Sequence, residues 1–378
     1  MKMFLHSPDQ DTDIRTIYQK AFNEAVELYL VTAYLTHWDM SLKLNKSCEN
    51  FRVIIGKDFG ITKKSACHKI MQWLPSERKS QFLVADKIDG FHPKAIFWKD
   101  TENKYHVLIG SSNLTKAAFE NNYEANIYSE IDSESYSQAK NWIGKITEKA
   151  VVVSEDWLAQ YIEGTPSRSK NKPLNNSDKQ TSIASLLLPL PDGAKDKVDE
   201  RRQQIFKHQA VKSSLHELFV NCASKSILSS EFYSQLPDFW SWEIGNRLQG
   251  RGWERRGRAS NFHELSISYL KIIKASDFER DDVVVREIDR LKKLKVSART
   301  AFFSEMLCLT YPERYPVLNK PVWSYLEDIN FRAPKGASEG VAYIDLAKKL
   351  RLSLKENPSH PAQNLAELDT VIWLQYHE

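Results

Sequence analysis

Residues 165–182 divide this chain into two parts that have to bury their apolar side chains separately. The sequence of this segment, TPSRSKNKPLNNSDKQTS, is dominated by Ser, Asn, Lys and Pro and cannot form a core. At 378 residues the chain is also too long for one typical core. We therefore predict a first domain at residues 1–165, a linker or extended arm at 166–204 and a second domain at 205–378.

The first 165 residues alternate between helical and strand patterns, which is typical of an α/β layer fold. Apolar residues recur at helical spacing in segments such as DIRTIYQKAFNEAV, whereas ELYLVTAYLT is a continuous apolar run of the kind found in buried strands. Helices are expected at 13–26, 63–74 and 135–147, and strands at 27–36, 50–58, 81–86, 91–99, 105–109 and 122–130.

The part after residue 205 is mostly helical in pattern and contains no internal repeat. In DDVVVREIDRLKKL, at 281–294, four apolar residues recur at spacings of three and four and form one stripe: Val284, Ile288, Leu291 and Leu294. Further helices are expected at 298–310, 320–329, 341–354 and 365–376. The short apolar piece IASLLLPLP, at 183–191, is expected to dock as an edge strand or an extended arm.

The tryptophans of this second part are expected to be core residues because large aromatic side chains are usually buried. The expectation covers Trp240, Trp242 and Trp373. In the helix at 320–329 we expect Val322, Trp323 and Leu326 to bury one face.

Charge and cysteine usage restrict the class of protein. The net charge is only +4, so any basic surface that binds a polyanion has to be local. The four cysteines are scattered with no C-x-x-C pair, which argues against a zinc site or a disulfide framework and fits a reducing cytosol. The N-terminus becomes polar too early for a signal peptide, and no apolar run is long enough to span a bilayer. We predict a cytoplasmic protein that does not bind a membrane.

Two apolar segments are interrupted by polar residues that a buried hairpin would have no reason to contain. If residues 91–99 form a strand, His92 and Lys94 point to the same side, with Cα atoms roughly 7 Å apart. The next strand ends in Gly110-Ser111-Ser112-Asn113, which returns beside them, and Gly110 and Ser111 are expected to allow a close approach there. An imidazole, an ammonium and an amide that converge in this way suit an anion with charge on its oxygens, above all a phosphodiester. The imidazole acts as a nucleophile or a proton carrier.

The motifs HPK and GSSN together resemble the His-x-Lys … Gly-Ser-x-Asn signature of the phospholipase D superfamily. The resemblance covers residues 1–165 and implies a mixed-sheet sandwich with flanking helices, followed here by the mostly helical second domain. It also implies a metal-independent reaction through a phosphohistidine, with His92 as the nucleophile or as its acid counterpart. Lys94 and Asn113 would bind the non-bridging oxygens, with help from Ser111.

The acidic residue of the family pattern is displaced in this chain. The aspartate that often follows the lysine by five residues is Lys99 here, and Asp100 comes one position later. The nuclease branch of the superfamily, which includes metal-independent restriction endonucleases, uses instead an acid about one strand after the asparagine. The resemblance assigns this position to Glu124, which we expect to accept a hydrogen bond from the far imidazole nitrogen of His92.

The chain contains one His-x-Lys motif and no second Gly-Ser-x-Asn. A mechanism with two histidines therefore needs two chains, and we predict a two-fold homodimer formed through the catalytic domain with one composite site. Histidines without a lysine two positions later are His68, His208 and His216. No catalytic role is expected for His37, His106, His263 and His360.

The most basic stretch of the second part is RLQGRGWERRGRASNFHE, at 247–264. Arginines can contact phosphates in pairs of hydrogen bonds, and a tryptophan can stack on a base, so the stretch is a candidate DNA-binding loop. The alternative is a solvated loop held by one buried tryptophan. The candidate residues are Arg247, Arg251, Trp253, Arg255, Arg256 and Arg258.

Taken together, the sequence predicts a metal-independent nuclease of restriction or anti-phage type that hydrolyses DNA. Two alternatives share the same site chemistry. One is a phospholipid-directed hydrolase of the same superfamily, and the other is a catalytically idle phosphate-binding scaffold.

Overall fold

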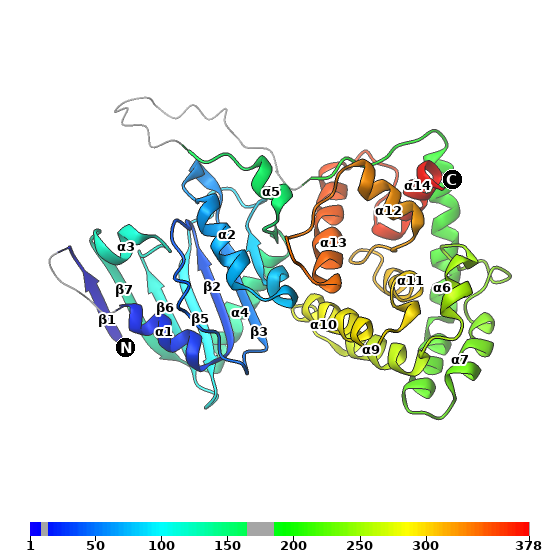
Figure 1. Cartoon of the computed structure of the whole chain (residues 1–378), viewed down its shortest axis with the longest axis horizontal. Helices are drawn as coiled ribbons and strands as arrows, with labels where there is room; N and C mark the ends of the chain where they lie inside the picture. The colour runs from blue at the N-terminus through cyan, green and yellow to red at the C-terminus, as the bar shows by residue number, and fades with distance from the viewer. Residues whose placement is uncertain (9–13, 165–184, 378) are drawn as a thin grey trace. The chain divides into compact units, whose positions relative to one another are not determined.

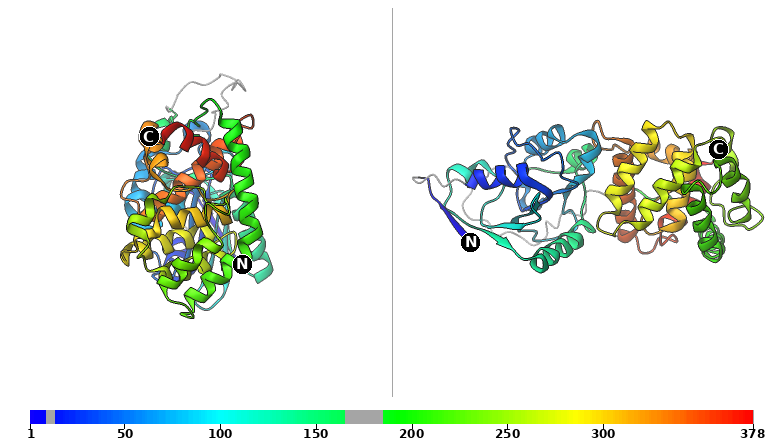
Figure 2. Two further views of the ribbon diagram at one scale, coloured as in Figure 1. Left: turned by 90° about the vertical axis from the view of Figure 1, so that its right-hand side faces the viewer. Right: turned by 90° about the horizontal axis from the view of Figure 1, so that it is seen from below.

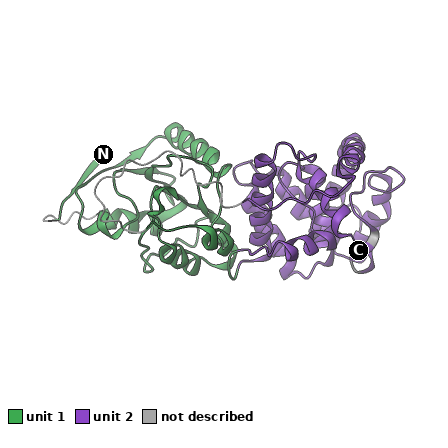
Figure 3. Ribbon diagram, turned by 90° about the horizontal axis from the view of Figure 1, so that it is seen from above, with its two compact units in different colours: residues 1–184, 334–336 green, residues 185–333, 337–378 purple. Residues whose placement is uncertain are grey.

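The computed structural model describes residues 1–8, 14–164 and 185–377, which fall into two compact units (Figure 3). The first unit comprises residues 1–184 with 334–336, and the second comprises residues 185–333 with 337–378. The linker sequence at 165–182 lies outside the described residues. Each unit is described by itself below.

The first unit is built on an eight-stranded mixed sheet in the order β1-β7-β6-β5-β2-β3-β4-β8. The pairs β2–β3 and β3–β4 are parallel, and all other neighbouring strands are antiparallel. The strands are β1 (Lys2–His6), β2 (Ala25–Thr32), β3 (Asn50–Ile55), β4 (Phe82–Val84), β5 (Lys94–Asp100), β6 (Tyr105–Gly110), β7 (Glu124–Ile131) and β8 (Val151–Val152).

Helices cover both faces of this sheet, with α1 and α2 on one face and α4 on the other (Figures 1 and 2). Phe22 of α1 packs edge-on against Phe51 of β3, at 6.2 Å between ring centroids, and Tyr136 of α4 packs against Tyr105 of β6 at 4.7 Å. This architecture confirms the mixed sheet with flanking helices that the sequence predicts. The helices are α1 (Ile14–Glu24), α2 (Lys64–Trp73), α3 (Lys116–Glu120), α4 (Ser133–Thr147) and α5 (Glu155–Gln160), with short 3₁₀ turns η1 (Asp58–Gly60) and η2 (Ser76–Gln81).

The strand register brings the ends of β2 and β6 and the starts of β5 and β7 together on one side of the sheet, where these strands begin or end. Lys94, the first residue of β5, pairs with Thr32, the last residue of β2. Gly110, the last residue of β6, pairs with Asn126 near the start of β7. Side chains on these two pairs alternate between the faces with a period of two. The polar residues at the strand ends therefore share the face that α1 covers.

The second unit is entirely helical in its described regular structure, and one apolar core runs through it. Helix α6 packs against α9 and α14, α10 packs against α9 and α13, and α12 packs against α14. The elements are α6 (Ala194–Ala223), α7 (Ser229–Gln235), η3 (Leu236–Asp238), η4 (Arg251–Trp253), α8 (Glu254–Gly257), α9 (Phe262–Lys274), α10 (Arg280–Lys293), η5 (Ser297–Arg299), α11 (Ala301–Thr310), α12 (Lys320–Asp328), α13 (Glu339–Glu356) and α14 (Leu365–Tyr376). None of the described helices is both long and apolar enough to cross a membrane.

The apolar piece before α6 is an extended arm and not an edge strand. Its backbone is tied to the helices by three hydrogen bonds, which join Leu186 N to Ser353 Oγ at 2.7 Å, Tyr325 Oη to the Leu187 carbonyl at 2.8 Å and His360 Nε2 to the Pro189 carbonyl at 3.0 Å. Helix α6 begins at Ala194, inside the segment predicted as linker, because Ala194 and Val198 are buried in the core one turn apart.

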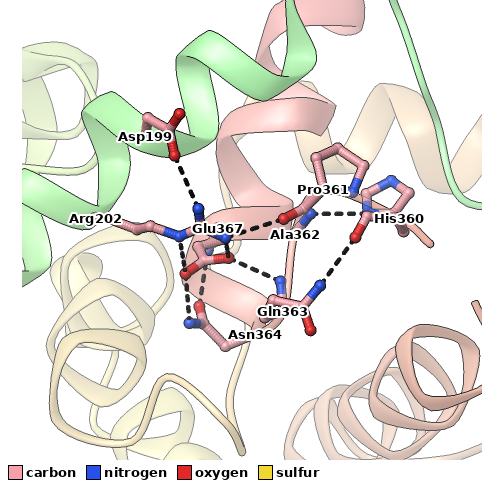
Figure 4. A network of polar contacts seen from close by, with 8 residues as sticks. All are labelled: Asp199, Arg202, His360, Pro361, Ala362, Gln363, Asn364 and Glu367. Carbon is pink, nitrogen blue, oxygen red and sulfur yellow. Dashed lines mark hydrogen bonds and ion pairs between the residues drawn. The ribbon is translucent and has the colours of Figure 1, made fainter. Parts of the chain in front are cut away.

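A polar network joins α6 to the loop before α14 (Figure 4). Arg202 donates to both carboxylate oxygens of Glu367 and to the Pro361 carbonyl, and it also pairs with Asp199 at 2.8 Å. The same carboxylate accepts hydrogen bonds from the backbone of Gln363 at 2.7 Å. The network fixes the loop that contains His360, and His360 in turn hydrogen-bonds to the extended arm.

Three tryptophans differ from the expectation that they are core residues. Trp240 is buried, but the exposed fractions of Trp242, Trp323 and Trp373 are 44%, 54% and 38%. In α12 the buried pair is Val322 and Leu326, which are four residues apart. Trp323 is one position further along, about 100° around the helix, and therefore points away from that face.

Glu305 of α11 is fully buried, and burial raises the pKa of its carboxyl group to about 7. One carboxylate oxygen accepts hydrogen bonds from Trp240 Nε1 at 3.1 Å and from Leu248 N at 2.6 Å. Because the folded-state pKa lies above the ordinary value of 4.5, the stability that this group contributes is full below pH 4.5 and is lost as the pH rises to about 7.

We therefore expect the helical unit to become less stable between pH 4.5 and pH 7, by up to about 3 kcal/mol from this group. The variant Glu305→Gln keeps an acceptor oxygen without a charge and should make the decline smaller. The measurement is native-state hydrogen exchange of the α11 amides at several pH values. An equal decline in the variant would contradict the assignment to Glu305.

Candidate active site

His92 lies two residues before Lys94, and their side chains meet as predicted, but β5 begins only at Lys94, so His92 lies outside the strand expected at 91–99. His92 is exposed, and the Lys94 ammonium lies 2.9 Å from its Nδ1 atom and 3.0 Å from its carbonyl oxygen. The same Nζ atom lies 3.3 Å from Nε2, so the ammonium contacts both ring nitrogens of His92. The pair therefore presents an exposed imidazole beside a positive charge.

The charge of Lys94 is available for an anion. Among the residues that the structure describes, Lys94 forms no ion pair. Partial burial lowers its pKa from the ordinary value, and the nearby Glu124 carboxylate opposes this shift. A half-buried ammonium without a paired carboxylate, next to an exposed imidazole, is a site where an anion would be stabilised.

Asn113 is held at the same strand ends by its amide oxygen. Its Oδ1 atom accepts hydrogen bonds from Tyr34 N at 3.1 Å and from Thr32 Oγ1 at 3.3 Å, and Thr32 is the register partner of Lys94. Within the described part of the chain, its Nδ2 atom has no hydrogen-bond partner. The amide group is thereby oriented with its two donors free for a ligand.

Gly110 allows β6 and β7 to approach closely at this point, as expected from the sequence. A Cβ atom at Gly110 would lie 2.2 Å from the Ala125 carbonyl oxygen and 2.4 Å from Asn126 Oδ1, so no other residue fits. Directly after it, the Ser111 backbone N–H donates to the same Ala125 carbonyl at 3.0 Å. This contact fixes the start of the turn that carries Asn113.

Glu124 and Ser111 are joined to each other rather than to His92. The Ser111 hydroxyl donates to one Glu124 oxygen and accepts from Ala125 N at 3.0 Å, and the other Glu124 oxygen accepts from Asn122 Nδ2 at 3.1 Å. The expected hydrogen bond between Glu124 and His92 is therefore not formed within the described chain, because both carboxylate oxygens bind other donors.

Asp100 has a structural role far from these residues. It is the last residue of β5, six residues after Lys94, which corresponds to about 20 Å along a strand. Its carboxylate is buried, contacts His106 Nε2 at 2.7 Å and caps the β5–β6 turn by accepting from the backbone of Glu102 and Lys104. The absence of a catalytic role for His106 fits this geometry.

Three residues beside the site were not singled out from the sequence. Thr32 and Tyr34 position Asn113, as described above, and the Tyr34 ring also packs edge-on against His92 at 5.6 Å. His6 is the register partner of Glu124 across β1 and β7, is 7% exposed, and has no partner for either ring nitrogen among the described residues. The sequence pattern that could have placed His6 is the strand-like alternation in residues 2–6, in which Phe4 and His6 are buried. No strand was expected at these residues.

Two of the candidate DNA-binding residues pack against the core of the second unit. Arg247 is 5% exposed, pairs with Glu254 at 2.7 Å, and its guanidinium stacks 4.2 Å from the Trp240 ring. Trp253 is partly buried and packs against Trp240 and Phe302, with ring centroids 6.1 and 4.9 Å apart. The Arg247 side chain is not free to contact a phosphate, so its assignment is wrong, whereas that of Trp253 stays a prediction.

The remaining residues of this stretch divide into two groups. Arg255 and Arg258 are exposed, whereas the side chains of Arg251 and Arg256 lie outside what the structure describes. Gly257 serves packing, since a Cβ atom there would lie 2.5 Å from the Trp253 ring. The stretch is a 3₁₀ turn followed by a short helix, η4 and α8, rather than an open loop.

Comparisons with known proteins give one family model and five matching chains of solved structures. The family model described as "Cardiolipin synthase, PLD-like domain" matches residues 18–147. The solved structure of NucT from Helicobacter pylori is 21% identical, covers 40% of this chain and 98% of its own, and has a TM-score of 0.30, which is too low to support a conclusion. No curated protein matches the chain. The matched segment holds His92, Lys94, Ser111, Asn113 and Glu124, and over residues 18–147 the chain is similar to this phospholipase D-like domain.

Proposed function

We propose that the protein is a metal-independent nuclease of restriction or anti-phage type, which cleaves DNA through a phosphohistidine at a site shared by two subunits. The observation that carries the proposal is the exposed imidazole of His92 beside the unpaired ammonium of Lys94. Asn113 supplies two free amide donors from the neighbouring strand end. These groups match the needs of phosphoryl transfer, which depends mainly on positioning and on stabilising charge at the phosphate oxygens.

In the first step a ring nitrogen of His92 attacks phosphorus, and the bond from phosphorus to the leaving oxygen breaks. The leaving oxygen takes a proton from the imidazolium of a second histidine. Lys94 and Asn113 hold the non-bridging oxygens. In the second step water attacks the phosphohistidine, the second histidine takes the proton of that water, and the P–N bond breaks to release a phosphate monoester.

We infer that the second histidine comes from another chain. Within the matched domain, His106 is buried and paired with Asp100, His68 lies exposed on α2, and His37 lies exposed in the loop after β2. His6 is buried behind Glu124 in the sheet. His92 of a second subunit, brought in by a two-fold axis, supplies an equally exposed imidazole.

An exposed apolar surface lies beside the site and offers a contact for this second copy. On the sheet face opposite α1, Met3 pairs with Ile127, which pairs in turn with Ile109, and Leu5 is next to Met3 on the same face. The exposed fractions are 60% for Met3, 37% for Ile127, 50% for Ile109 and 56% for Leu5. We call these four residues the edge patch. Ile109 directly precedes Gly110, so the edge patch reaches the strand ends that carry the site, although it lies on the opposite face of the sheet.

The first test concerns the metal and the oxyanion-binding groups. We expect DNA hydrolysis to persist in excess EDTA, because Lys94 and Asn113 supply the charge and donors that a metal ion supplies in other nucleases. Lys94→Ala and Asn113→Ala should each lower kcat by about 10²-fold or more, since each removes a preorganised group at a developing charge. The measurement is single-turnover cleavage of a labelled DNA. Activity that requires added magnesium would contradict the proposal.

The helical unit is proposed to contribute to DNA binding through Arg255 and Arg258, which are the exposed candidates on α8 and at its end. Replacement of both by alanine should weaken DNA affinity uniformly across sequences and reduce its salt dependence, because phosphate contacts carry no sequence information. Arg286 on α10 has no assigned role in binding and provides a control substitution.

A further inference from the structure

A cavity of about 270 Å³ lies beside the candidate active site in the first unit. It is enclosed by α1, by the loop after β2 and by α3. Leu114 and Lys116 line it, and they follow Asn113 by one and three residues. Consecutive Cα atoms are 3.8 Å apart, so the cavity begins within about one nucleotide of the amide proposed to hold the phosphate.

A second observation ties the cavity to the site independently of the chain connection. Tyr18 of α1 lines the cavity, and the pKa of its hydroxyl is raised first by burial and then by the Glu124 carboxylate. Glu124 is therefore close enough to the cavity to act on one of its walls electrostatically.

The walls of the cavity are aromatic. Tyr18 and Phe119 meet edge-on with ring centroids 5.2 Å apart, and Trp38 is 2% exposed and packs against Phe22 and Trp73 behind the cavity. Trp38 Nε1 has no hydrogen-bond partner among the described residues. A buried indole N–H without an acceptor is costly, and an acceptor on a ligand would remove this cost.

The rim of the cavity has charges of both signs. Arg15 and Lys116 share the carboxylate of Glu120, at 3.0 and 3.5 Å, and the pKa of Asp39 is lowered by hydrogen bonds from Ser41, which keeps this second acid ionised. Such a rim does not select an anion. It suits instead the mixed donors and acceptors on the edge of a neutral, flat, heteroaromatic ring.

We propose that this cavity receives an unpaired nucleobase of the nucleotide next to the scissile phosphodiester. The inference rests on the proposed phosphodiesterase function and adds a substrate class to it. The base stacks on the aromatic wall, and a ring nitrogen or carbonyl oxygen of the base accepts from Trp38 Nε1. A base inside a duplex is stacked and paired and cannot enter, so the strand that is cleaved has to be single-stranded or locally opened at this position.

The test uses thymidylyl-thymidine, which has one scissile bond, and its two analogues in which one or the other thymine is missing. With the wild-type protein we expect one of the two analogues to lose about 10- to 100-fold in kcat/KM, the size of a base–aromatic stacking contact. Phe119→Ala should reduce cleavage of thymidylyl-thymidine to the level of that analogue, and it should leave cleavage of the analogue itself unchanged. Trp38→Phe should lose about 5- to 10-fold on thymidylyl-thymidine, as expected for one hydrogen bond.

Two matched variants control for general damage to the fold. Phe97→Ala removes a half-buried ring that packs against Trp142 on the opposite face of the sheet. Trp98→Phe removes another buried indole N–H that has no partner among the described residues, but Trp98 does not line the cavity. Both should keep the wild-type ratio between thymidylyl-thymidine and the analogues.

Failure of this inference can be distinguished from failure of the proposed function. If the wild type cleaves all three substrates equally, or if Phe119→Ala keeps the wild-type ratio, the base-binding assignment is overturned and the phosphodiesterase stands. If no substrate is cleaved, a binding measurement tests the inference instead. In equilibrium dialysis, the His92→Ala protein should bind thymidine 5′-phosphate. Adding Phe119→Ala to this variant should abolish the binding, and adding Phe97→Ala should preserve it. Absence of such binding would overturn the inference as well.

Discussion

We expect His92→Ala to lower kcat for DNA cleavage by roughly 10⁴- to 10⁶-fold, which is the scale of losing a nucleophile. This is the largest effect we expect in the chain, because His92 is the group proposed to form the covalent bond. The side chain is exposed, so its removal leaves no cavity in the core and the fold should be unchanged. DNA affinity should change little, since Lys94 and Asn113 remain in place. The measurement is single-turnover cleavage together with a binding titration.

The matched control is His68→Ala, which removes another exposed histidine of the same unit, from α2. It should keep wild-type turnover. The covalent intermediate provides a second readout, because a phosphohistidine is destroyed by acid and survives alkali, whereas a phosphoserine survives acid. Wild-type protein quenched in alkali during turnover of a labelled substrate should retain acid-sensitive label, and His92→Ala should retain none. An acid-stable label would assign the nucleophile to a hydroxyl such as Ser111 and contradict the proposal.

The centre of the candidate site could be predicted because it depends on local geometry. His92 and Lys94 are two residues apart, and this short separation keeps their side chains together although only Lys94 belongs to β5. Gly110 was expected to permit a close approach, and the contacts around its missing Cβ confirm this. Asn113 follows β6 in a hairpin whose two strands are adjacent in sequence, so its return to Lys94 involves no long-range pairing.

The parts that were missed depend on contacts between distant segments. The partner of Glu124 is Ser111, across β6 and β7, and nothing in the sequence distinguishes this hydroxyl from His92 as a donor. His6 lies beside Glu124 only because the five-residue strand β1 adds to the far edge of the sheet. Both features are set by which strands pair, and a strand of this length has too weak a pattern to reveal its partner.

The arginine-rich stretch of the second unit shows a related difficulty. Arginine is usually exposed, and the sequence therefore favoured a surface loop. Arg247 instead forms an ion pair with Glu254 and stacks on Trp240, and these two contacts offset the desolvation cost of burying its guanidinium. The two partners come from positions seven residues away on either side, so a composition argument could not separate this arginine from the exposed Arg255 and Arg258.

The requirement for a second chain leads to the other large effect. Ile127→Asp places a charge in the centre of the edge patch, between Met3 and Ile109. We expect a monomer in sedimentation and a loss of cleavage of order 10²-fold or more, because the second imidazole is lost with the partner. Ile61→Asp is the matched control, since Ile61 is 38% exposed compared with 37% for Ile127 but lies outside the edge patch. A monomeric Ile127→Asp with full activity would contradict the shared site.

A mixed dimer tests the shared site without disturbing the interface. Each active unit needs two intact copies of His92, so a heterodimer of wild-type and His92→Ala subunits, purified through two different tags, should cleave no faster than the His92→Ala homodimer. If wild-type and His92→Ala subunits are mixed randomly in equal amounts, the shared-site model predicts about a quarter of the wild-type activity, because about a quarter of the dimers carry two intact copies of His92. If each chain worked alone, the activity would be about half. The purified heterodimer distinguishes the two models directly, because with a site contained in one chain the heterodimer would keep half of the wild-type rate. Such a result would place the second proton carrier inside the same subunit, where His6 beside Glu124 is the first residue to examine.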